Sequence, residues 1–195
     1  MTGPATGGAP DVDVRVVAGT ARVDDLDDFL ADVNAVRETT GAVVQVFDAR
    51  YVVTRPPLVR AVELAERAAA RGEAVARDRA VEVLLYAAGR RQIDRALAMG
   101  VDEGEGPAAA VVYAPAAEEG GRGDDAREAS VGQAVDRVRD LLTDAALVDP
   151  GEDVPGTDRA TVREFFDVSD AELAAVDGTL ADVVLERVAL LDVEK

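Results

Sequence analysis

Apolar residues along the chain follow two patterns, which predict two kinds of secondary structure. Nearly continuous apolar runs of four to nine residues predict buried β-strands, and they lie at residues 12–19, 42–48, 107–115 and 145–149. Apolar residues spaced three or four positions apart predict amphipathic helices, and they lie at residues 24–41, 54–72, 78–88 and 131–142, with shorter helices at 93–97 and between 157 and 191. Pro56 and Pro57 suit the first turn of their helix, and Gly41 and Gly72 suit helix ends.

This order of elements predicts an α/β fold. We expect about four strands in a small mixed sheet, covered by about seven helices, because each element must bury its apolar side against another layer. The Gly- and Pro-rich residues 1–11 are predicted to be disordered. Residues 12–195 are predicted to form one domain, with a mobile polar loop at 116–128.

Composition narrows the chemistry that the chain can perform. It has no Cys and no His, so thiol nucleophiles, disulfides and His-based triads or zinc sites are excluded. The apolar runs are far shorter than a bilayer span and no secretory signal is evident, which predicts a cytoplasmic protein without membrane contact.

The acidic residues define the expected surface. Asp and Glu number 39 against 21 basic residues, the net charge is -18, and Lys195 is the only lysine. Dispersed acids with almost no lysine are typical of halophilic proteins, whose hydrated carboxylates keep them in solution at high salt. An acidic surface aimed at a basic partner is the alternative. Against this background a single Asp or Glu is poor evidence for catalysis.

Arginine is concentrated in one part of the chain. Residues 50–97 contain ten arginines and six acids, a net charge of +4, so the remaining residues sum to -22. The stretch "LLYAAGRRQIDRAL" places Arg90, Arg91 and Arg95 directly after a predicted helix and Gly89. Arginine forks match phosphate oxygens, and Gly89 and the N-terminus of the following helix would add free N–H donors. The alternative is ordinary pairing with acids on helix surfaces, as Arg67 could make with Glu63.

Several stretches of the sequence resemble one family. "EVLLYAAGRRQIDRALAMGV" (82–101), followed by "AAAVVYA" (108–114), is similar to the small regulatory subunit of the KEOPS complex, the PRPK-binding (TPRKB) family, in its archaeal form. The tail stretches "VREFFDVSDAELAAVDG" (162–178) and "VVLERVALLDVEK" (183–195) resemble the closing helices of that family. The acidic surface, the N-terminus and the loop at 116–128 depart from the family pattern.

The resemblance implies a binding role, so on this basis we expect no enzymatic activity, metal, cofactor or small-molecule substrate. The KEOPS complex attaches threonylcarbamoyl to an adenosine of tRNAs that read codons beginning with A, and another subunit performs the transfer. Family members bind the N-terminal lobe of a kinase-like ATPase subunit, and archaeal members hold the single-stranded 3′ CCA end of tRNA. On this basis we expect two sets of contacts. The first is a tRNA surface comprising Gly89, Arg90, Arg91, Gln92 and Arg95, with part of the arginine series between residues 50 and 79. The second is a set of ATPase contacts by Leu180, Val184 and Val188.

Two other functions remain open from the sequence. One is a pure assembly protein without RNA contact. The other is a carboxylate- and magnesium-dependent enzyme acting on a phosphate ester, which would need a carboxylate pair that the sequence does not single out.

Overall fold

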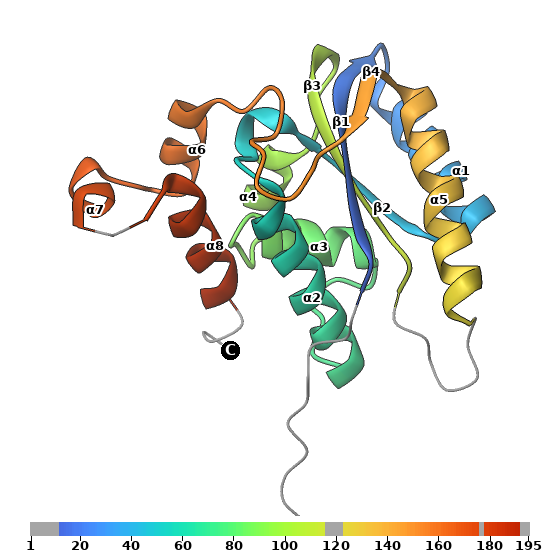
Figure 1. Ribbon diagram of the computed structural model, residues 1–195, viewed down its shortest axis with the longest axis horizontal. Coiled ribbons are helices and arrows are strands. Elements are labelled where there is room, and N and C mark those ends of the chain that lie inside the picture. The colour runs from blue at the N-terminus through green and yellow to red at the C-terminus, as the bar shows by residue number, and fades with distance from the viewer. Residues whose placement is uncertain (1–11, 116–122, 176–177, 192–195) are drawn as a thin grey trace, which may run out of the picture.

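The structure is a computed structural model that describes residues 12–115, 123–175 and 178–191. Figure 1 shows one central sheet with helices on both of its faces. The strands are β1 (Val14–Val23), β2 (Val43–Asp48), β3 (Gly104–Tyr113) and β4 (Leu142–Leu147). The helices are α1 (Leu26–Thr40), α2 (Arg55–Arg71), α3 (Arg79–Ala87), α4 (Ile93–Ala96), α5 (Asp124–Leu141), α6 (Arg159–Phe165), α7 (Asp170–Ala175) and α8 (Leu180–Leu190), with 3₁₀ turns η1 (Ala49–Tyr51) and η2 (Leu97–Met99).

The predicted fold class is confirmed: a four-stranded sheet lies among eight α-helices in the described residues, in one compact domain. The strand order is β2-β3-β1-β4, and the central pair β1–β3 is in register from Val14↔Tyr113 to Val23↔Gly104. All three strand pairings are antiparallel, so the prediction of a mixed sheet is wrong in this respect. The sequence did not show strand direction, because a strand buried on both faces carries the same apolar run in either direction.

Alternating side chains of the sheet enter two separate cores. On one face, Val14 and Val16 of β1 and Tyr113 of β3 pack with α2, α3 and α8. On the other face, Val17 of β1 and Val112 of β3 pack with α1 and α5. Figure 1 shows these helices on opposite sides of the sheet. Burial of both faces explains why the strands read as apolar runs rather than as alternating apolar and polar residues.

Two predicted helix starts follow their capping residues. The Ser169 hydroxyl accepts a hydrogen bond from the Glu172 N–H at 3.1 Å, at the start of α7. The Asp182 carboxylate accepts from the Thr179 N–H at 2.6 Å, at the start of α8. These side chains satisfy backbone groups that the first helical turn leaves free.

The predicted loop at 116–128 needs correction. Residues 124–128 form the first turn of α5, where Asp124 and Asp125 face the positive end of the helix dipole. Residues 116–122 and the predicted disordered residues 1–11 lie outside the described residues.

None of the helices in the described ranges is long and apolar enough to cross a bilayer.

Gly156 provides a test of how the fold closes around the sheet. It has a left-handed φ of 90°, and a Cβ placed there would lie 2.3 Å from the Cβ of Pro107 on β3. We expect Gly156→Ala to lower the free energy of unfolding by about 2–4 kcal/mol through strain and overpacking. Urea denaturation followed by circular dichroism measures this change.

The matched control is Gly132→Ala on the exposed side of α5, where no atom lies within 4 Å of the added Cβ. This change should raise stability by about 0.5–1 kcal/mol through helix propensity. Equal stability of the Gly156→Ala variant and the unmodified chain would contradict the packing described here.

Candidate nucleic-acid interface

The candidate interface begins with the way α3 is anchored. Asp78 caps this helix, because its Oδ1 accepts hydrogen bonds from the N–H groups of Ala80 at 2.8 Å and Val81 at 3.2 Å. Arg37 of α1 reaches the other carboxylate oxygen at 2.6 Å. Burial opposes ionisation of Asp78, but these hydrogen bonds outweigh it, so the pKa of Asp78 lies below its ordinary value. The start of α3 is therefore fixed to the helix layer on the other face of the sheet.

A buried charged group attaches α3 to α2 and to the sheet. Glu66 of α2 is 3% exposed. Its carboxylate is 2.6 Å from Nη1 of Arg79 on α3 and accepts a hydrogen bond from the Tyr113 hydroxyl of β3 at 3.0 Å. Burial, together with the adjacent negative charge of Glu66, raises the pKa of Tyr113. Arg79 thus neutralises a carboxylate in the core, which removes it from the predicted set of RNA-facing arginines.

Gly89 turns the chain at the end of α3. Its φ is +59°, a conformation that residues with a Cβ rarely adopt. Its N–H donates to the Tyr86 carbonyl at 2.9 Å, and the Arg90 N–H donates to the Leu85 carbonyl at 3.0 Å. The prediction of a free N–H at Gly89 is therefore wrong, because this group and the Arg90 N–H close the C-terminal turn of α3.

Arg90 does not extend into solvent. Its Nη2 donates to the Phe165 carbonyl at 2.6 Å, and its guanidinium lies over the Phe165 ring, 5.4 Å from the centroid. Asp167 is 3.5 Å away and largely exposed. The side chain of Arg90 is 27% exposed, and it contacts Phe165 of α6.

The next polar residues are exposed. Arg91, Gln92 and Arg95 all lie at the surface of the α3–α4 connection and α4. Arg91 Nη2 makes one long hydrogen bond, 3.3 Å, to the Leu191 carbonyl just beyond α8. Gln92 precedes α4, and its side chain makes no capping hydrogen bond. Within the described residues the side chain of Arg95 makes no hydrogen bond or ion pair, and its backbone N–H donates to the Gln92 carbonyl at 3.1 Å. These three predicted residues are therefore all exposed, within five positions of the chain.

Two apolar residues on the same surface were not predicted as site residues. Ile93 is 43% exposed and Leu97 is 55% exposed, whereas Ala96 and Met99 face the core. The sequence showed only that this short helix has apolar residues at helical spacing, which does not reveal which side is covered. We call Arg91, Gln92, Ile93, Arg95 and Leu97 the α4 surface.

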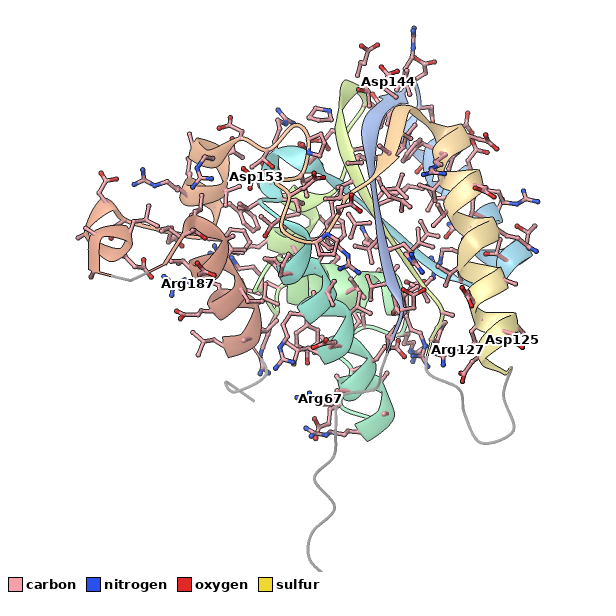
Figure 2. All side chains as sticks on the ribbon, in the orientation of Figure 1. Arg67, Asp125, Arg127, Asp144, Asp153 and Arg187 are labelled. Carbon is pink, nitrogen blue, oxygen red and sulfur yellow. The ribbon has the colours of Figure 1, made fainter. Side chains whose placement is uncertain are left out.

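Most of the remaining arginines between residues 50 and 79 contact other groups of the protein. Arg50 and Arg60 pair with Asp48 and Glu63, and Arg55 donates to the Val14 carbonyl. Arg71 and Arg77 are exposed and make no such contact within the described ranges. Figure 2 shows charged side chains around the whole molecule, including Arg67 from α2 and, on the far side of the sheet, Asp125 from α5. The positive charge is therefore partly neutralised rather than displayed as one continuous face.

The predicted partner contacts need correction. Leu180, Val184 and Val188 are 1%, 3% and 0% exposed and belong to the core that joins α8 to the sheet. They cannot also serve as surface contacts in this fold, because their side chains already pack inside it. The large apolar residue that α8 does expose is Leu190, at 47%.

Sequence comparison assigns the chain to a family. A family model described as "Kinase binding protein CGI-121" matches residues 25–192. The chain belongs to the CGI-121 family. The match spans α1 through α8 and includes the whole α4 surface. No curated protein matches the sequence.

Arg79 gives a test of how the CGI-121 fold holds α3. We expect Arg79→Met to lower the free energy of unfolding by about 2–3 kcal/mol, because it leaves the buried Glu66 without its cation. The side chain of Arg79 is 35% exposed, which keeps the effect at the lower end of the range for buried pairs.

Arg60→Met is the matched control. The side chain of Arg60 is 32% exposed, similar to that of Arg79, but its partner Glu63 is 31% exposed, whereas the side chain of Glu66 is 2% exposed. Its loss should cost less than about 1 kcal/mol. Equal costs for the two variants, measured by urea denaturation, would show that Glu66 does not depend on Arg79.

Proposed function

We propose that this CGI-121 protein is the non-catalytic regulatory subunit of a KEOPS tRNA-modification complex, which binds the kinase-like ATPase subunit and the 3′ CCA end of tRNA. Membership of a kinase-binding family supports the first contact. The observation that carries the second is the α4 surface, where exposed arginines and an amide adjoin exposed apolar side chains on an otherwise acidic molecule.

The chemistry of the α4 surface suits a single-stranded RNA end. Arg91 and Arg95 can bind phosphate oxygens, and the Gln92 amide can donate to and accept from a base edge. Ile93 and Leu97 can pack against unstacked bases. Recognition of single-stranded ends combines these three kinds of contact. A double-stranded RNA would instead require a broad cationic face, which the paired arginines of α2 and α3 do not provide.

The RNA contact predicts the effect of charge reversal. The double variant Arg91→Glu/Arg95→Glu should bind tRNA at least about tenfold more weakly, because two phosphate contacts become repulsive. Electrophoretic mobility shift with intact tRNA and with tRNA lacking CCA measures the effect. Removal of CCA should weaken binding to the unmodified chain and have little further effect on the variant.

Arg22→Glu is the control for charge reversal outside the α4 surface. Arg22 is exposed at the end of β1 and makes only a long ion pair, 3.4 Å, with Asp24. This variant should retain tRNA binding. Equal tRNA binding by all forms would place the RNA contact away from the α4 surface. Absence of tRNA binding by the unmodified chain would favour an assembly protein without RNA contact.

We place the kinase contact on the exposed end of α8. The family description supports a kinase partner but names no surface. Leu190 is nearly half exposed at the end of α8, and burial of an exposed apolar side chain in an interface is favourable. The candidate contact therefore moves from the buried side of α8 to its exposed C-terminal end.

Co-purification tests this placement. We expect Leu190→Asp to weaken binding to the kinase-like ATPase subunit by about 30-fold, as for a central interface residue. Leu30→Asp on α1 is the matched control, because Leu30 is 44% exposed on the other side of the sheet. Equal retention of the kinase by the two variants would move the contact away from Leu190.

The proposal assigns no catalytic step to the chain. The described residues contain no group of three or more potential metal ligands placed to hold an ion. A carboxylate enzyme would reveal itself by turnover of a phosphate ester by the isolated chain, abolished by replacing one Asp or Glu.

We also propose that the chain is adapted to high salt. Asp24, Asp25, Asp27, Asp28 and Asp32 are all exposed around the start of α1, where their mutual repulsion opposes folding at low ionic strength. The urea midpoint should therefore rise with KCl concentration, and Asp27→Asn/Asp28→Asn/Asp32→Asn should reduce that dependence. A midpoint that does not change with KCl would contradict the adaptation.

A further inference from the structure

We infer that Arg90 is a positioning residue, which fixes the α3–α4 connection against α6 so that Arg91, Gln92 and Arg95 are presented together to RNA. This inference rests on the proposed RNA contact, and it gives Arg90 a role different from that of its neighbour Arg91.

The contacts of Arg90 all lead into the protein. Phe165 receives both the 2.6 Å hydrogen bond, at its carbonyl, and the guanidinium, over its ring. Hydrogen bonds from a charged group are among the stronger ones, and a guanidinium over an aromatic face adds a further attraction. A guanidinium held in this way has little freedom to turn toward a phosphate.

The partner of Arg90 is itself held firmly. The Phe165 ring meets the Tyr51 ring edge-on, with centroids 5.2 Å apart, and the Phe166 ring at 5.0 Å. Phe166 is 4% exposed and belongs to the core. The whole chain has only seven aromatic residues, four Phe and three Tyr. Three of the seven, Tyr51, Phe165 and Phe166, thus lie together where Arg90 contacts α6.

The α4 surface needs such support because little else fixes it. The helix α4 has a single turn of four residues, and a helix of that length is not stable on its own. It follows directly on the Gly89 turn and the exposed residues Arg91 and Gln92. Burial of Ala96 and Met99 anchors its far end. Arg90 anchors the near end, next to the residues proposed to bind RNA.

The salt dependence of tRNA affinity separates positioning from direct contact. Each phosphate contact to a single strand contributes about 0.7 to the slope of log K against log [salt]. We expect Arg91→Gln to reduce this slope by about 0.7. Arg90→Met should weaken binding about tenfold, a typical coupling between neighbouring sites, while the slope stays that of the unmodified chain. Circular dichroism confirms that each variant is folded over the KCl range used.

Phe165→Leu tests the contact between Arg90 and Phe165 by changing the other partner. It removes the ring under the guanidinium without changing any charge. If Arg90 and Phe165 act as one unit, Phe165→Leu also weakens binding, and the double variant Arg90→Met/Phe165→Leu binds about as well as either single variant. Additive losses would mean that the two residues act separately. Should Arg90→Met fail to fold, Arg90→Lys keeps the charge and one donor for the Phe165 carbonyl, and it should bind RNA with an intermediate affinity and an unchanged slope.

Each outcome decides the role of Arg90. A smaller slope of log K against log [salt] for Arg90→Met would show that Arg90 contacts a phosphate. An affinity equal to that of the unmodified chain would show that the contact between Arg90 and Phe165 does not affect binding. Both results overturn the positioning role while leaving the proposed function in place. Absence of tRNA binding by the unmodified chain would overturn the proposed function first, and it is seen before any variant is made.

Discussion

The buried carboxylate of Glu66 connects three elements on which the candidate site depends. It lies in α2, accepts from Tyr113 of β3 and pairs with Arg79 of α3. A buried charge without a partner is strongly unfavourable, so the cation and the hydroxyl must be in place whenever the core is formed. The arrangement therefore sets where α3 lies on the sheet. Because only residues 88–92 separate α3 from α4, the position of α3 also determines where the α4 surface lies.

Neighbouring arginines in this region have different tasks. Arg79 neutralises a carboxylate in the core, Arg90 lies on an aromatic ring, and Arg95 is exposed. Arginine suits all three settings, because its planar fork both pairs with carboxylates and stacks on rings while remaining charged. The positive charge counted along the sequence thus overstates the charge offered to a ligand, and the remaining cationic surface is small. A small surface beside Ile93 and Leu97 fits a short single-stranded RNA end better than a duplex.

The sequence predicted most of the helices and strands because their signals are local. Helix-ending glycines such as Gly41 and Gly72 act within one turn, and both are found where they were predicted. Contacts between distant segments could not be predicted in this way. Arg90 and Phe165 are 75 residues apart, and nothing in either stretch indicates the other. The apolar side of α8 reads the same whether it covers the protein's own core or a partner. Leu180, Val184 and Val188 were therefore mistaken for surface contacts, and the exposure of Ile93 and Leu97 was missed.

The central claim is that tRNA binds at the α4 surface. Amide hydrogen exchange of the full chain, with and without tRNA ending in CCA, tests it most directly, because it locates the contact without any substitution. The account predicts that tRNA slows exchange at residues 89–97 and leaves the exposed face of α5, across the sheet, unchanged. Slowed exchange at α5 with no change at residues 89–97 would contradict it.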